Sequence, residues 1–222
     1  MFVYTGGRGH GTTQFISAGA DTWKVPHGTR RVLVTLIAGG GGSAAGSGTG
    51  GSGGGGGGEV VTGYITTIPG ETLTITVGAG GSASPTETAG GNTTVSGTFG
   101  SVTATGGSAS TPGISDGAAG GGVNGGAGGA QALPAFDGSM GSAGTSSVSG
   151  DFTYYGGGGG GGGAAIGMDG GTGGASGYGG AGQAPIAEFG GGGGAAVTPA
   201  SFAGIGAAGG GGGNQGLVVI TW

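Results

Sequence analysis

The residues that could perform chemistry are few and widely spaced. The two histidines, His10 and His27, stand 17 residues apart, and no acidic residue lies near either one at metal-ligand spacing. The only lysine is Lys24, and no glycine run ends in Lys-Ser or Lys-Thr, as a phosphate-binding Walker loop requires. The five Asp stand singly, no Gly-x-Ser-x-Gly elbow joins a strand to a helix, and Cys is absent. The sequence therefore predicts no enzyme, no metal site and no cofactor.

Glycine dominates the composition, and charge is scarce. Of 222 residues, 74 are Gly, and 4 cations against 9 acidic residues leave a net charge of −5. Collagen is also one-third Gly, but it needs a strict Gly-X-Y period and abundant Pro, whereas this chain has 7 Pro and unbroken runs such as 156–163. Four cations cannot neutralise many phosphates, so we expect no nucleic-acid partner. With no basic segment before an apolar one and no run of about 18 apolar residues, we expect a cytosolic product without membrane insertion.

Large apolar residues divide the chain into two kinds of material. Residues 1–105 with 217–222 hold 29 of the 46 Val, Ile, Leu, Met, Phe, Tyr and Trp residues, whereas 106–216 hold 45 of the 74 Gly. We therefore predict a β base with glycine-rich loops, 1–105, completed by a strand at 217–222. The second part, 106–216, is a glycine-rich body that leaves the base and returns to it.

Runs rich in β-branched residues predict the strands of the base. These runs are 31–37, 60–68, 72–77, 92–95, 99–103 and 217–222. Thr alternates with apolar residues in 72–77, which predicts one wet and one buried face. Pro69-Gly70-Glu71 suits a turn, so 60–68 and 72–77 are expected to form a hairpin, and 92–95 with 99–103 a second one. No stretch has a helical period, and the predicted base is a small β-sandwich in a chain with essentially no α-helix.

The glycine-rich body needs a physical account, because Gly loses the most backbone entropy on ordering and brings no side chain to bury. Apolar and Pro-bearing clusters interrupt the runs, which linkers rarely show. A period of three recurs in 170–181. Three residues per turn is the polyproline II-type helix, whose backbone groups must find partners on neighbours. We predict a bundle of polyglycine II helices, hydrogen-bonded laterally without a hydrophobic core; a disordered or silk-like segment is the alternative.

Two motifs of the base, Trp23-x-Val25-Pro26-x-Gly28 and Pro69-Gly70-Glu71-Thr72, carry the most specific resemblance. With them the chain resembles the glycine-rich domains of phage tail proteins, and its later Gly runs are similar to the polyglycine II sandwich of distal adhesins on long tail fibres. The resemblance spans nearly the whole chain. Its other elements are Phe15, Asp21, Val32 to Leu36, Gly39 to Gly42, Gly53 to Gly58, Tyr64, Val77 to Gly81, Gly90 to Thr93 and Gly216 to Val219.

The resemblance implies a receptor-binding tip whose loops contact a bacterial outer-surface receptor, either a protein or a glycan. It also implies a place in the virion, on the tail or the fibre tip, assembled in the host cytoplasm beside other tail or fibre proteins. Tail fibres are usually trimeric, so one copy or a homotrimer is left open. Two alternatives are an ice-binding protein, since snow flea antifreeze proteins also use polyglycine II helices, and a purely structural tail or coat protein. Those antifreeze proteins are secreted and disulfide-linked, whereas this chain has no Cys.

The number of spans predicts which loops face the host. Six Gly-rich runs, an even number, can take the chain away from the base and back: 117–130, 138–146, 156–163, 170–182, 190–195 and 204–214. Counting outward from the base puts 131–137, 164–169 and 196–203 at the far end, with the tips of two shorter excursions, 39–58 and 78–91. The expected host-facing residues are Pro134, Phe136, Asp137, Met168, Asp169, Pro199 and Phe202. Loops 147–155 and 183–189 should lie near the base, where Tyr154, Tyr155 and Phe189 would pack.

Overall fold

The protein is all-β. A computed structural model describes residues 10–43, 53–82, 86–111, 117–130, 139–161, 174–178 and 213–222. Within these ranges there are ten strands and no α-helix, as predicted, and no helix is long and apolar enough to cross a membrane. The strands are β1 (Thr12–Phe15), β2 (Gly19–Lys24), β3 (Arg31–Ile37), β4 (Val60–Thr66), β5 (Thr72–Val77), β6 (Thr93–Gly97), β7 (Gly100–Ala104), β8 (Ser146–Ser149), β9 (Phe152–Tyr155) and β10 (Leu217–Thr221).

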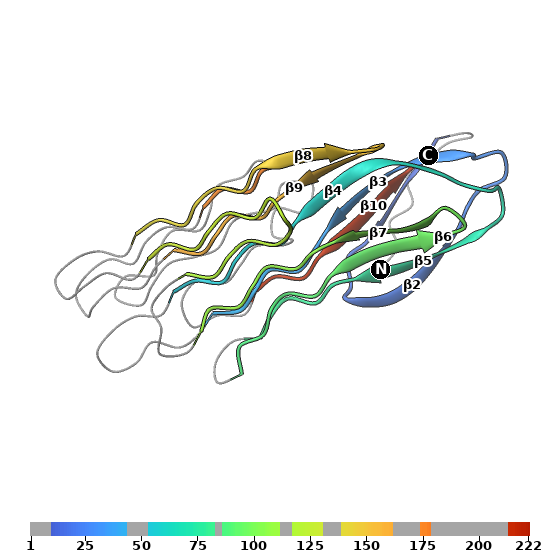
Figure 1. Cartoon of the computed structure of the whole chain (residues 1–222). Coiled ribbons are helices and arrows are strands. Elements are labelled where there is room, and N and C mark those ends of the chain that lie inside the picture. The colour runs from blue at the N-terminus through green and yellow to red at the C-terminus, as the bar shows by residue number, and fades with distance from the viewer. Residues whose placement is uncertain are drawn as a thin grey trace.

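Two antiparallel sheets pack face to face as a sandwich (Figure 1). One sheet has six strands in the order β1-β10-β3-β4-β9-β8, and the other has four in the order β2-β5-β6-β7. In β5, Leu73, Ile75 and Val77 are buried and the intervening Thr residues are exposed, which confirms the predicted two-faced strand. Burial of such apolar faces drives the association of the sheets. Trp23 closes the core, with its ring centroid 5.1 Å from that of Trp222.

The predicted hairpin between 60–68 and 72–77 is wrong. β4 pairs with β3 and β9 in the six-stranded sheet, whereas β5 pairs with β2 and β6 in the other sheet. The turn at Pro69 and Gly70 therefore carries the chain across the sandwich. The backbone of this turn finds its partners in a different loop, because Thr67 donates to Arg30 O and Gly70 donates to Val25 O.

Other strand predictions are confirmed. β6 and β7 form the expected hairpin, with a turn at Thr98 and Phe99. β10 is the expected last strand, and it lies between β1 and β3. Strands β1, β2, β8 and β9 were not predicted from the sequence.

Beyond one end of the sandwich, glycine-rich spans bind one another through their backbones. Their hydrogen bonds recur at every third residue, which is the period of a polyproline II-type helix. Pairs of N–H to O=C bonds with this spacing are Gly54 to Gly161 with Gly57 to Gly158, Ala118 to Gly54 with Gly121 to Gly57, Gly126 to Gly157 with Gly129 to Gly160, and Gly156 to Thr145 with Gly159 to Ser142. The predicted three-residue period is thus present in this part of the chain.

The spans form a lattice, not a sheet. A strand in a sheet has at most two neighbours, whereas span 53–59 hydrogen-bonds to spans 38–43, 105–111, 117–121 and 156–161. Close approach is possible because the crossing points are Gly. A Cβ at Gly157 would lie 2.0 Å from the carbonyl oxygen of Gly57, far inside van der Waals contact.

The prediction of 117–130 as a single span is wrong. The chain turns at Val123 and Asn124, Gly125 donates to Gly122 O, and Gly120 donates to Gly126 O on the returning segment. Gly122 has φ +80°, a left-handed conformation that suits Gly. Two antiparallel spans, 117–121 and 125–130, therefore replace the predicted one, and span 105–111, which had not been counted, precedes them.

Candidate functional site

Several described spans of the lattice extend away from the sandwich, and their ends lie far from it (Figure 1). The spans leave the sandwich from the ends of β3, β5, β7 and β9, and Figure 1 shows them running side by side away from the sheets. Neighbouring spans are backbone-bonded along their length. The segments between the spans are thus anchored at both ends to a scaffold without flexible side chains at its crossing points.

Three hydrogen bonds hold one pair of span ends together. Ser139 N donates to Ala130 O at 3.1 Å, Ala130 N donates to Ser139 Oγ at 2.5 Å, and Ser139 Oγ donates to Ala130 O at 3.1 Å. These bonds clamp the two residues that flank 131–138. The clamp fixes the two ends of that segment against each other.

All seven predicted host-facing residues lie outside the described residues. Pro134, Phe136 and Asp137 fall between the clamped ends Ala130 and Ser139. Met168 and Asp169 fall between Gly161 and Gly174, and Pro199 and Phe202 fall in 179–212. The placement of these side chains therefore stays a prediction, as does the placement of Phe189.

The prediction that Tyr154 and Tyr155 pack against the base is confirmed. Both belong to β9, which pairs with β4 in the six-stranded sheet. Tyr154 packs against the sandwich core, and Tyr155 packs against Ile37, Val60 and Leu217. Tyr178, in span 174–178, contacts Tyr155 edge to face, with ring centroids 4.8 Å apart.

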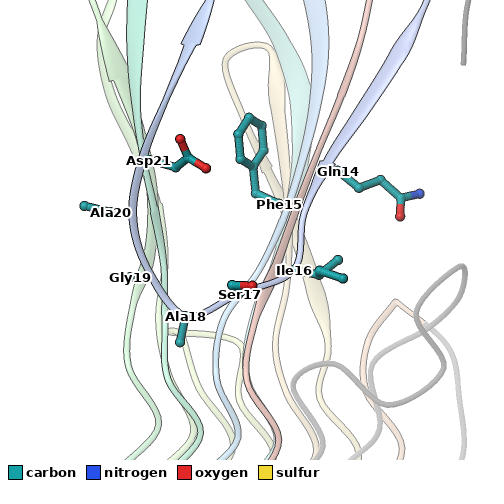
Figure 2. Close-up of a pocket in the computed structure, with 8 residues that line it drawn as sticks. All are labelled: Gln14, Phe15, Ile16, Ser17, Ala18, Gly19, Ala20 and Asp21. Atoms are coloured by element: carbon teal, nitrogen blue, oxygen red, sulfur yellow. The ribbon is translucent and has the colours of Figure 1, made fainter. Parts of the chain in front are cut away.

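A shallow pocket lies where the chain crosses from β1 to β2. Figure 2 shows Phe15 and Asp21 pointing toward the space inside this loop, whereas Gln14, Ile16 and Ala20 point away from it. Phe15 is 5% exposed and belongs to the core, and Asp21 Oδ1 accepts the N–H of Thr22 at 2.7 Å. No histidine, lysine or arginine lines the pocket. No group of three His, Asp or Glu with metal-binding geometry occurs in the part of the chain that the structure describes.

Glu59 is a buried carboxyl at the junction of sandwich and lattice, and the sequence reading missed it. Its side chain is 3% exposed, and its Oε2 accepts the N–H of Thr105 at 2.9 Å. The carboxyl also lies against Gly122, where an added Cβ would be 2.2 Å from Oε1. Burial raises the pKa of Glu59 above its usual value of 4.5, although the hydrogen bonds from Thr105 act against this. One signal existed in the sequence, because Glu59 is the single charge between a Gly run and a strand.

Glu59→Gln is expected to flatten the pH dependence of stability. A raised pKa in the folded state means that Glu59 supports folding fully below pH 4.5, and that this support is lost as pH rises through the folded-state pKa. Gln stays neutral and keeps an oxygen for the Thr105 N–H. Thermal melts from pH 4.5 to 8 should therefore show a fall in midpoint for the wild type that the variant lacks, with the variant more stable at pH 8. Parallel profiles for the two proteins would show that Glu59 does not titrate differently on folding.

Comparison with known proteins gives one family. The model of the glycine-rich domain family matches residues 4–222. The chain belongs to this family. The glycine-rich character inferred from the sequence is thereby confirmed. A search of curated proteins finds no match.

Proposed function

We propose that this glycine-rich domain protein is a receptor-binding protein of a phage tail fibre or tail tip. The observation that carries the proposal is the clamped pair Ala130 and Ser139 at the end of a backbone-bonded lattice. A rigid support for an intervening segment suits recognition, because a segment held at both ends loses less conformational entropy when it binds.

Low charge supports the same reading. The net charge of −5 is spread over 222 residues, and exposed lattice positions such as Ala119, Ala127 and Ser142 carry small neutral side chains. Recognition would then rest on the segments between spans, which contain Phe136, Met168 and Phe202. Large apolar side chains of this kind are typical anchors at binding interfaces.

In this proposal the partner is a protein or glycan on the bacterial outer surface, and the protein acts in the virion beside other tail or fibre proteins. Neither nucleic acid nor membrane insertion is involved. One copy or three would serve equally, because the recognition segments come from a single chain.

The double variant Phe136→Ala/Phe202→Ala is expected to weaken adsorption of the purified protein to host cells by at least about tenfold. Buried aromatic anchors typically contribute about 1–4 kcal/mol each, and about 1.4 kcal/mol corresponds to one factor of ten. Fluorescently labelled protein titrated onto cells measures the effect. Val123→Ala is the matched control, because Val123 is 95% exposed at the turn on the sandwich side of the lattice.

Three results separate the possibilities. Loss of adsorption in the double variant but not in the control supports the prediction that the end of the lattice far from the sandwich faces the host. Loss only on replacing Tyr154 and Tyr155, with the fold intact, would reverse that assignment. A wild-type protein that binds no cells but arrests ice growth would favour the ice-binding alternative, and one that does neither would favour a purely structural tail or coat protein.

A further inference from the structure

At the end of the sandwich opposite the lattice, three loops are joined by hydrogen bonds and form a surface that the proposed function does not use. It contains loop 25–30, the turn 67–71 and the β6–β7 turn. Thr67 N donates to Arg30 O at 2.9 Å, and Val25 N donates to Glu71 O at 2.9 Å. The bond from Val25 to Glu71 joins the two motifs that carry the most specific sequence resemblance, so the motifs build one end of the molecule.

The side chain of Glu71 adds further hydrogen bonds between these loops. Its Oε1 accepts the N–H of Ile68 at 2.7 Å, and its Oε2 accepts the hydroxyl of Thr98 at 2.6 Å. Burial slightly opposes ionisation of Glu71, but the hydrogen bonds from Thr98 and Ile68 hold its pKa below the usual 4.5. Both carboxylate oxygens of Glu71 therefore accept hydrogen bonds, and these bonds hold the turn 67–71 to the β6–β7 turn.

Positive charge is concentrated at this end. Lys24 is the last residue of β2, Arg31 is the first of β3, and Arg30 precedes it; all three are exposed. They are the only Lys and Arg residues within the described ranges, and no ion pair to a described residue engages them. Set against the Glu71 carboxylate at the same end, these three cations still leave the local charge positive in a chain of net charge −5.

Apolar surface accompanies the charge. Ile68 is 56% exposed in the turn, and Tyr64 is 46% exposed near the end of β4. The guanidinium of Arg31 lies 4.1 Å from the centroid of the Tyr64 ring, so a cation and an aromatic ring are presented together. We call Lys24, Arg30, Arg31, Tyr64 and Ile68 the basal cluster.

We propose that the basal cluster docks this protein onto an acidic protein surface of the tail, through carboxylates that meet Lys24 and Arg30 and an apolar contact that covers Ile68. The inference rests on the proposed function, and it goes further by naming the attachment surface. Charge complementarity carries it, because the described cations all lie at one end of an otherwise acidic chain. The geometry fits as well, since a partner at this end leaves the far end of the lattice free.

A phosphate-rich partner fits the cluster less well. Phosphate surfaces are bound by many cations, each worth about 1 kcal/mol near an anionic membrane, and three would hold the protein weakly. Exposed Ile68 and the Tyr64 ring suit a protein interface, where an apolar centre is rimmed by charge.

Incorporation into tails tests the proposal. Tail particles assembled without this protein are mixed with the purified protein, re-isolated and probed by immunoblot. Wild-type protein should be incorporated, less so at 300 mM than at 50 mM NaCl. Lys24→Glu/Arg30→Glu should be incorporated at least about tenfold less, because both attractive contacts become repulsive. Ser108→Glu/Ser142→Glu, which adds the same negative charge at two exposed positions of the lattice, should behave as the wild type.

Cell adsorption and vesicle binding distinguish the outcomes. The Lys24→Glu/Arg30→Glu protein should bind cells as the wild type does, so loss of incorporation with retained adsorption supports the docking surface. Equal incorporation of variant and wild type, or no incorporation of either, would overturn it. It would equally fall if the wild type bound phosphatidylglycerol vesicles through Lys24 and Arg30 while incorporation stayed unaffected. Incorporation through the cluster by a protein that binds no cells would instead refute the receptor-binding proposal and leave the docking surface standing.

Discussion

Val in place of Gly159 or Gly174 is expected to lower the melting temperature by roughly 10 °C or more, which corresponds to about 3 kcal/mol in a chain of this size. A Cβ at Gly159 would lie 2.0 Å from the carbonyl oxygen of Ala127, and one at Gly174 would lie 2.0 Å from that of Ser142. The spans would have to separate. Separation breaks buried backbone hydrogen bonds, such as the 2.8 Å bond from Gly174 N to Gly159 O, and each orphaned group costs about 1–3 kcal/mol.

Ala127→Ser is the matched control for this pair, because Ala127 is exposed on a neighbouring span and already carries a Cβ. Differential scanning calorimetry of the three variants gives the comparison. The control should melt within a degree or two of the wild type, since exposed substitutions usually change stability by less than about 0.5 kcal/mol. Unchanged melting of both Val variants would mean that these positions face solvent and that the lattice does not exist in solution.

Amide hydrogen exchange in the lattice is expected to be slower than in an unstructured chain by a factor on the order of 10³ or more. Glycine in a flexible linker exchanges within seconds, whereas Gly120, Gly126 and Gly160 each donate a backbone hydrogen bond of 2.8–3.0 Å to another span. Peptides covering 117–130 and 139–161, followed by mass spectrometry, measure the protection. Uniform exchange within seconds in both peptides would establish the linker alternative.

The protected amides should follow the observed partners and not merely the glycine content. Val123 lies in the turn and is 95% exposed, so it provides an internal reference for fast exchange. Protection at Gly120 and Gly126 around a fast Val123 would locate the reversal between the two spans.

The predicted direction of the later spans, toward or away from the sandwich, is correct because two errors in the predicted number of spans cancel. Span 105–111 was missed, because Ser108 and Ser110 interrupt its glycines, and 117–130 was read as one span although it reverses at Val123. Each error changes the count by one, so the side assigned to Tyr154 and Tyr155 came out right. The three-residue period can thus be read from the sequence, but the number of spans cannot, because a reversal made by two residues inside a glycine run leaves almost no compositional trace.

Pairing partners were the least predictable part of the sandwich. Alternation in β5 is visible in the sequence, but the choice between a hairpin with β4 and a crossing to the other sheet depends on partners of the turn backbone in loop 25–30. β8 has four exposed residues and little apolar content, so it lacks a strand signal; it forms because β9 pairs with it. Glu59 was missed for a related reason, since its burial depends on Thr105 and Gly122, which are distant in sequence.

The lattice also governs how stability varies with temperature. The heat-capacity change of unfolding comes from newly exposed apolar surface, whereas newly exposed peptide groups lower it. The described spans bury mainly backbone and small side chains such as Ala118, whereas the sandwich buries large apolar side chains such as Leu36 and Ile75. The heat-capacity change of unfolding per residue is therefore smaller than in an ordinary domain. The curve of unfolding free energy against temperature is flatter as a result. A molecule built in this way keeps nearly the same rigidity in cold and warm water, where a hydrophobic core would loosen on cooling.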